Sequence, residues 1–312
     1  MTESKHELSV NDFADLFGSK LSYFSKECSA FIDECNFSFT PLSLDETEAT
    51  LEEISTIIES GRLTKAGKGG IDRWEKGWAE NLNDFINSNY SPESLTPKYV
   101  RPDKIMRLKG KYIRSSNGYF ELDFYSVLRY WLYQNFACDT DCIYEFACGP
   151  GYNLHFMSKL FPDKKLIGLD WAQPAVELVS LIGDKLKLNI SGMKFDMFSP
   201  DNSMKFNDNS LFLTMGGLEQ LGPNHKNFID FLLSKQAKRI IHIEPIVEMY
   251  NTESALDRIA VNFHNHRNYL VGLLPYLNEL ENCNKIKFIH KQRLEYGSFF
   301  HDGWSILIYE PL

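Results

Sequence analysis

The chain has 312 residues, 43% of them hydrophobic and 24% charged, which is enough for one large domain or two smaller ones with a sizeable core. Its formal net charge of −9 disfavours a protein that binds nucleic acid in bulk by neutralising phosphates. The opening residues, MTESKHELSVND, are polar, and no apolar run approaches the roughly 18 residues of a spanning helix. We therefore expect a soluble, cytoplasmic protein with no membrane span.

The cysteines also narrow the class of protein. The six cysteines include no CxxC pair and have no His or Cys partners at zinc-binding spacing. The sequence therefore predicts no metal site and no disulfide framework. It leaves open whether the chain forms a homo-oligomer.

The first part of the chain reads as helical. Apolar residues recur at steps of three and four over residues 10–35, which predicts one amphipathic helix. Ser43 and Glu46 form a capping-box pattern before a second helix, and a third is expected over residues 71–85. We predict that residues 1–120 form an all-helical cap or substrate-binding region.

A local run of positive charge follows in YVRPDKIMRLKGKYIR, between Arg101 and Arg114. In an acidic protein this run is either a solvated connector or an anion-binding segment, and the sequence leaves both open.

The pattern changes over residues 121–312. Apolar strands such as CIYEFAC, KLIGLDWA, SLFLTMGG and RIIHIEPI alternate with helical stretches, which indicates a parallel sheet covered on both faces. The last two strands, KIKFIHKQRL and WSILIYEP, have no room between them for a crossover helix and must pair antiparallel. The predicted fold is α/β, with a Rossmann-like, mostly parallel seven-stranded sheet that ends in an antiparallel hairpin.

Three successive strands end in polar or glycine-rich loops. The first is followed by Gly149 and Gly151, the second ends at Asp170 and the third at Asp196. In an open parallel sheet, ligands bind beyond the carboxyl ends of the strands. A carboxylate about twenty residues beyond the glycines suits a ribose, and Asp196 beside apolar surface suits an adenine. Together the three loops predict a nucleoside-like ligand.

On these residues the chain resembles the class I S-adenosylmethionine-dependent methyltransferases. EFACGPG looks like the glycine-rich first motif of that family, with Ala147 where the first glycine usually stands. The resemblance implies S-adenosyl-L-methionine as cofactor, with Asp170 on the ribose and Asp196 on the adenine. The cofactor-binding residues that it implies are Glu145, Ala147, Cys148, Gly149, Gly151, Asp170, Trp171, Asp196 and Met197.

Other readings of the same architecture stay open. One is a nicotinamide enzyme, which would need a third glycine where Leu154 stands. Another is a sheet that binds no cofactor and has the same turns. A protein that binds S-adenosylmethionine without turnover, as a regulator, is a further alternative.

Candidate catalytic groups lie on the later loops. Glu219 follows the fourth strand, and Glu244 ends the fifth. His266 and Arg267 interrupt an apolar helical face in a long insertion and are expected to line an acceptor pocket or to pair inside the core. We predict that Glu219, Glu244 or His266 is the general base and that Arg267 holds an anionic part of the acceptor.

The order of YIR, EFACGPGYNL, LDWA, GGLEQ, IEP and FHDGW is also loosely similar to sugar O-methyltransferases of bacterial surface-polysaccharide pathways. This resemblance implies O-methylation of a small polar acceptor, sugar-like or anionic, which the basic run would help to hold. The alternative is N-methylation of a small molecule or a protein.

Overall fold

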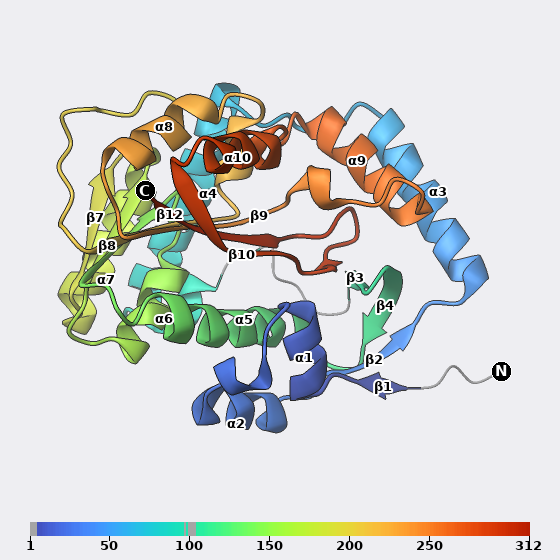
Figure 1. The fold of residues 1–312 in the computed structure, drawn as a ribbon. Coiled ribbons are helices and arrows are strands. Elements are labelled where there is room, and N and C mark those ends of the chain that lie inside the picture. Colours follow the sequence, from blue (N-terminus) through green and yellow to red (C-terminus); the bar gives the residue numbers. More distant parts are fainter. Residues whose placement is uncertain (1–4, 97, 99–103) are drawn as a thin grey trace.

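The computed structural model describes residues 5–96, 98 and 104–312, and its centre is a seven-stranded sheet (Figure 1). The strand order is β10-β12-β9-β8-β5-β6-β7. The bounds of these strands are β5 (Cys142–Phe146), β6 (Lys165–Asp170), β7 (Ile190–Lys194), β8 (Ser210–Met215), β9 (Arg239–Glu244), β10 (Ile286–Arg293) and β12 (Ser305–Pro311).

The pairing directions confirm the predicted fold. Strands β5 to β9 pair parallel with one another. Strand β12 is antiparallel to both β9 and β10, because the chain between β10 and β12 is too short for a crossover helix. The sheet is thus mostly parallel and ends in the expected antiparallel pair.

Helices cover both faces of this sheet, with α8 and α10 above it and α5 and α6 below it in Figure 1. The apolar cluster on one face includes residues of α5 (Phe120–Phe136), α6 (Tyr152–Leu160) and α7 (Gln173–Leu186). The cluster on the other face includes residues of α8 (Lys226–Ser234) and α10 (Leu273–Asn282). This burial on both sides explains why the central strands read as continuous apolar runs.

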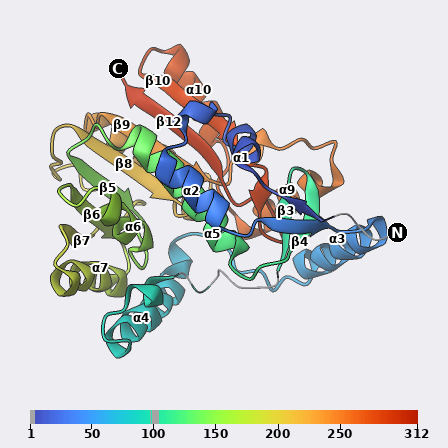
Figure 2. The same cartoon turned by 90° about the horizontal axis from the view of Figure 1, so that it is seen from below.

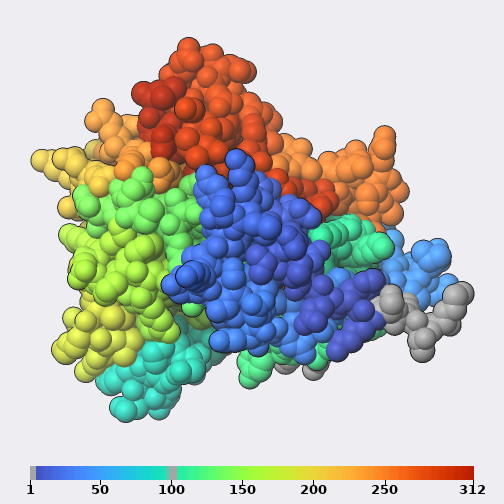
Figure 3. Space-filling model, turned by 60° about the horizontal axis from the view of Figure 1, so that its bottom comes forward, coloured from blue at the N-terminus to red at the C-terminus, as the bar shows by residue number. Residues whose placement is uncertain are grey.

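The prediction that the N-terminal region is all-helical is wrong. A second sheet, of order β1-β2-β4-β3-β11, takes four of its strands from that region and one from near the C-terminus. Its strands are β1 (His6–Glu7), β2 (Ser38–Pro41), β3 (Ile105–Leu108), β4 (Lys111–Ser115) and β11 (Tyr296–Gly297). These strands are too short to show a clear alternation, and their pairing depends on segments far apart in the chain. Figure 3 shows the N-terminal residues, in blue, packed continuously against the rest of the surface.

The helices of this region agree only partly with the prediction. The stretch expected to be one helix is divided into α1 (Val10–Leu16), η1 (Leu21–Tyr23) and α2 (Lys26–Glu34). Gly18 with a φ of +58° ends the first part, and the Ser25 hydroxyl accepts a hydrogen bond from the backbone N–H of Cys28 to begin α2. The predicted capping box of Ser43 and Glu46 is confirmed at the start of α3 (Leu44–Glu59).

The third expected helix is α4 (Ile71–Asn87), which lies beside α7 (Figure 2). Helix α3 packs instead on α9 (Ala255–Arg267) (Figure 1). In the part of the chain that the structure describes, no helix has the length and apolarity needed to cross a bilayer. The expected division of the chain after residue 120 falls in the first turn of α5 and stays a prediction.

The described part of the basic run leads into the hairpin of β3 and β4, and four of its cations pair with carboxylates. Arg101 lies outside the described residues. Lys104 pairs with Glu121, Lys109 with Asp12 and Arg114 with Glu46, at N···O distances of 2.9–3.1 Å. These residues thus already have anionic partners within the chain, so the structure gives no support to the role we expected for them in binding an anionic acceptor.

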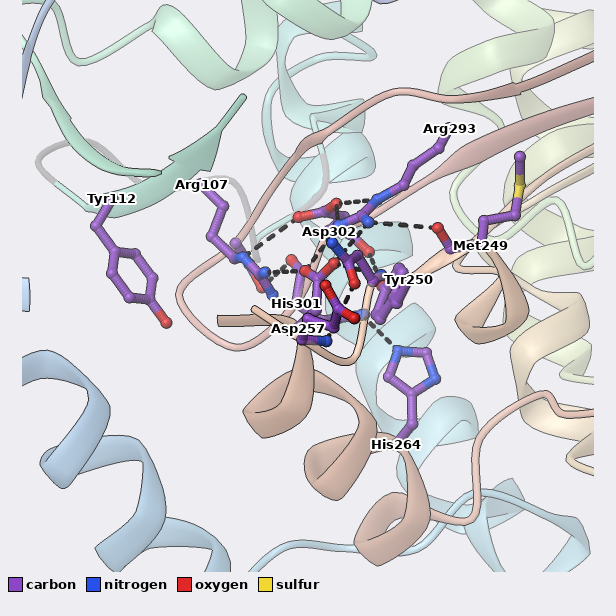
Figure 4. A network of polar contacts seen from close by, with 12 residues as sticks. Arg107, Tyr112, Met249, Tyr250, Asp257, His264, Arg293, His301 and Asp302 are labelled. Atoms are coloured by element: carbon purple, nitrogen blue, oxygen red, sulfur yellow. Dashed lines mark hydrogen bonds and ion pairs between the residues drawn. The ribbon is translucent and has the colours of Figure 1, made fainter. Parts of the chain in front are cut away.

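Arg107 of the same run is enclosed in a buried quartet of charges, formed with Asp257, Arg293 and Asp302 (Figure 4). The Arg107 side chain is 1% exposed, and its Nη2 lies 2.8 Å from Asp257 Oδ1. Arg293 Nη1 lies 2.7 Å from Asp257 Oδ2, and Arg293 also pairs with Asp302. Because two positive and two negative charges meet away from water, each depends on the others for compensation.

We expect Arg107→Met to lower the free energy of unfolding by about 3–5 kcal/mol, because it leaves a buried carboxylate charge uncompensated. Equilibrium unfolding in urea measures this change. The matched control is Lys109→Met, which removes an exposed pair and should cost less than about 1 kcal/mol. Equal losses in the two variants would show that the quartet stabilises the fold no more than a surface pair does.

Candidate active site

The candidate site lies where the chain reverses its course across the sheet. From β5 the chain continues to β6 and β7 on one side, and then returns to β8 and β9 on the other. The gap between the carboxyl ends of β5 and β8 is therefore the switch point at which open α/β sheets bind ligands. The glycine-rich segment follows β5 at this point.

The glycine-rich segment adopts the left-handed backbone that its residues allow. Gly149 has a φ of +52°, and Gly151 has a φ of +72° at the start of α6. The Gly149 N–H donates to Asp170 Oδ2 at 3.0 Å, and the Ala172 N–H donates to Asp170 Oδ1 at 2.9 Å. Asp170, 3% exposed, thus ties the glycine segment to the end of β6, and burial raises its pKa to about 6. The first two predicted loops therefore meet.

Ala147, which departs from the family pattern, also has a left-handed backbone, with a φ of +55°. Its methyl group is accommodated by a glycine on the neighbouring strand end: a Cβ at Gly217 would lie 2.4 Å from the Ala147 Cβ. Glycine at 217 thus provides the room that alanine at 147 needs.

We expect Ala147→Gly to raise the free energy of unfolding by about 0.5–1 kcal/mol, because a left-handed backbone costs roughly 1–2 kcal/mol for a residue with a Cβ and part of this gain is lost to unfolded-state entropy. Thermal unfolding measures the change. The same substitution at Ala79, inside α4, should have the opposite sign and cost about 1 kcal/mol. A loss of stability at both positions would contradict the assignment of strain to residue 147.

Two tryptophans of α4 cover the glycine segment. Trp74 and Trp78 stack with ring centroids 5.5 Å apart. A Cβ at Gly149 would lie 2.8 Å from Trp78 Cζ2, so the glycine also allows the indole to approach the backbone. The Gln173 N–H donates to Glu75 Oε1 at 3.0 Å, which joins α4 to the start of α7. The sequence predicted the helix but not its place over the site.

Two cavities meet beneath these tryptophans. The first is lined by side chains and backbone from the ends of β5, β6, β7 and β8, including Asp170, Trp171, Met197, Phe198 and Gln220. The second is lined by Arg129, Glu145, Cys148, Gly149, Tyr152 and Trp304, among others. The residues common to both are Trp74, Trp78, Ala147 and Gly216, which we call the waist.

The second cavity holds two charged groups with unused hydrogen-bonding capacity. Glu145 Oε1 accepts from Asn153 Nδ2 at 2.6 Å, and Arg129 Nε donates to Asn153 Oδ1 at 2.6 Å. Glu145 Oε2 and Arg129 Nη1 are buried and have no hydrogen-bond partner. Burial raises the pKa of Glu145 to about 8. A carboxyl oxygen and a guanidinium nitrogen without hydrogen-bond partners, at one cavity, match a ligand that carries both an ammonium and a carboxylate group.

Arg129 was missed from the sequence because it lies on α5, which reads as an apolar helix before the first strand. Its burial, at 4% exposed, is the signal, and that signal depends on the tertiary structure. Of the other predicted cofactor residues, some line a cavity and one does not. Trp171 and Met197 line the first cavity, whereas the Asp196 carboxylate accepts from the Phe198 N–H at 2.8 Å and is not among the lining residues.

Glu244 lies next to the site but is occupied by backbone donors. It is 0% exposed, and its two carboxylate oxygens accept from the N–H groups of Gly217, Leu218 and Glu219 at 3.0–3.3 Å. These groups begin the short helix η4 (Leu218–Leu221), so Glu244 positions the loop after β8. Burial raises its pKa to about 7.

The Glu219 carboxylate accepts fewer hydrogen bonds than the Glu244 carboxylate does. It is partly exposed, and its Oε1 accepts from Gln220 Nε2 at 3.0 Å. Desolvation and the nearby Glu244 raise the pKa of Glu219 to about 8, although Tyr269 and Arg267 favour its charged form. Gln220, the next residue, lines the first cavity.

The expected orientation of His266 is wrong. His266 is exposed, and its Nδ1 lies 2.9 Å from the carbonyl oxygen of Asn262 in its own helix. Helix α9 ends at Arg267 because Asn268 has a φ of +53°, so the expected apolar helical face does not continue beyond these two residues. His264 is the buried histidine of the segment, with Nε2 3.0 Å from Nδ1 of His301.

Arg267 joins the insertion to the N-terminal region. Its Nη1 donates to Thr64 Oγ1 at 2.9 Å, and its Nη2 donates to the Tyr269 hydroxyl at 2.7 Å. Arg267 is therefore bound to the segment that leads to α4, and its charge also acts on Glu219.

No family model and no curated protein matches the chain. Solved structures do match in fold. The [4+2]-cyclase SpnF is 10% identical with a TM-score of 0.52, over 80% of this chain and 97% of that one. The 16S rRNA methyltransferase RmtF, in complex with S-adenosyl-L-homocysteine, is 13% identical with a TM-score of 0.46, over 77% of this chain and 76% of that one.

These likenesses concern the fold. The mostly parallel sheet with its antiparallel C-terminal pair confirms the predicted Rossmann-like α/β fold. A likeness in fold to a protein named a cyclase does not identify the reaction, which has to be argued from the site.

Proposed function

We propose that this protein binds S-adenosyl-L-methionine and transfers its methyl group to a small polar acceptor. The observation that carries the proposal is a pair of buried atoms without hydrogen-bond partners, Arg129 Nη1 and Glu145 Oε2, at the second cavity, which shares its waist with the cavity that Asp170 lines. The amino-acid half of the cofactor carries an ammonium and a carboxylate, which these groups would hold. Asp170, Trp171 and Met197 in the first cavity would hold the nucleoside half.

We expect Arg129→Met to weaken binding of S-adenosylmethionine about 10- to 100-fold, because a charge-assisted hydrogen bond to a carboxylate is worth roughly 1.5–3 kcal/mol. Isothermal titration calorimetry measures the affinity. The Asp170→Ala variant should also bind weakly, since the carboxylate would hold the ribose and already orders the glycine segment.

The matched control is Arg258→Met, which removes an exposed arginine bound to backbone carbonyl oxygens of its own helix start. The affinity of this variant for S-adenosylmethionine should equal that of the parent protein. If the parent protein binds neither S-adenosylmethionine nor S-adenosylhomocysteine, the proposed function is wrong. If only Arg129→Met leaves the affinity unchanged, the amino-acid half of the cofactor is held elsewhere.

We further propose an acceptor hydroxyl, on a sugar or related metabolite, and Glu219 as the base that removes its proton. Two uncharged groups at the first cavity are available to a hydroxylated acceptor beside the nucleoside half of the cofactor, since Trp74 Nε1 is a buried unpaired donor and Gln220 Oε1 a buried unpaired acceptor. Glu219 supports the second part because its oxygens are less occupied than those of Glu244 and its side chain is less exposed than that of His266.

The reaction is sought by incubating the protein with S-adenosylmethionine that carries a labelled methyl group. The acceptor panel contains monosaccharides, sugar phosphates, primary amines and RNA. Label on a sugar supports O-methylation, and label on an amine supports the N-methyltransferase alternative. Binding of the cofactor without any transfer would favour the non-catalytic alternative.

We expect the rate of transfer to rise with pH up to about 8, because Glu219 has to be ionised to accept a proton and its pKa is raised to about 8. Glu219→Gln should lower single-turnover transfer about 10²–10⁴-fold, with cofactor affinity unchanged. The control is Glu253→Gln, an exposed carboxylate at the approach to α9. If Glu219→Gln keeps the transfer rate and the pH profile of the parent protein, another group is the base.

A further inference from the structure

The waist between the two cavities is walled mainly by aromatic rings. Trp74 and Trp78 border both cavities, together with the small residues Ala147 and Gly216. The first cavity offers groups for a nucleoside, and the second offers groups for an amino acid. Whatever chemical group joins those two halves of one ligand has to pass the two indoles.

Of the two rings, Trp78 has the more available surface. The guanidinium carbon of Arg73 lies 5.0 Å from the centroid of the Trp74 ring, which already occupies the electron-rich surface of that indole. Trp74 in turn stacks on Trp78 with an angle of 22° between the ring planes. The Trp78 ring has no cation among the contacts in the described part of the chain, and its Cζ2 edge rests against Gly149.

We propose that Trp78 recognises the positive charge at the centre of S-adenosylmethionine, and that the protein thereby distinguishes this cofactor from its demethylated product. The inference rests on the proposed function. The group that joins the nucleoside and amino-acid halves is a sulfonium, which carries a positive charge, and in the product it is a neutral thioether. A cation against an indole is attracted by the ring quadrupole, whereas a neutral sulfur gains only ordinary contact.

The arrangement also places the recognising residue outside the sheet. Trp78 belongs to α4, which is held by Glu75 to the start of α7 and by Arg73 to Thr64. Discrimination of charge therefore depends on the N-terminal region, while the groups for the two ends of the cofactor lie on and around the parallel sheet.

Calorimetric titration of parent protein, Trp78→Phe and Trp78→Leu with three ligands tests this inference. The ligands are S-adenosylmethionine, S-adenosylhomocysteine and sinefungin, in which a protonated amine replaces the methyl sulfonium. We expect Trp78→Leu to weaken binding of the two cationic ligands about 2- to 30-fold more than binding of S-adenosylhomocysteine. Trp78→Phe, which keeps a smaller aromatic face, should give an intermediate ratio.

The matched control is Trp171→Leu, which removes an indole from the first cavity away from the waist. This variant should bind all three ligands more weakly, by the same factor for each. An equal loss for all three ligands in Trp78→Leu would overturn the inference and leave the proposed function standing. Because the ratio of affinities is compared within one variant, a reduced fraction of folded protein does not change the result.

Discussion

The buried quartet of Arg107, Asp257, Arg293 and Asp302 is the interaction on which the rest of the structure depends. Charges removed from water are tolerated only with compensating partners, and here the partners come from four separate segments. These are strand β3, helix α9, strand β10 and the loop before β12. The quartet therefore joins the N-terminal sheet to the C-terminal half of the parallel sheet, as Figure 4 shows.

A chain of contacts leads from this quartet to the cover of the candidate site. Helix α9 provides Asp257 near its start and Arg267 at its end. Arg267 and Arg73 both donate to the hydroxyl of Thr64, and Arg73 precedes Trp74 in α4. The same quartet fixes Asp302, two residues before Trp304, which lines the second cavity. The quartet thus places both the cover and one wall of the site.

The parts of the site that could be predicted from the sequence are those that lie at the ends of neighbouring strands. Gly149 and Asp170 follow successive strands, so the sheet brings them together without help from distant residues. His266 was misjudged because the buried face of α9 includes Phe263 and His264, and the helix ends at Arg267, where Asn268 turns left-handed. Glu244 was placed correctly at a strand end, but only the fold shows that backbone N–H groups occupy its oxygens.

The sequence alone determined the parallel sheet, its antiparallel ending and the glycine segment at the switch point, because apolar strand length, connection length and backbone freedom are local properties. The tertiary structure decided what surrounds that segment. Arg129 faces the second cavity and Trp78 rests on Gly149 because distant helices pack there. Short strands pair into a second sheet for the same reason. Contacts between residues far apart in the chain leave no periodic trace in the sequence, so only the folded structure reveals them.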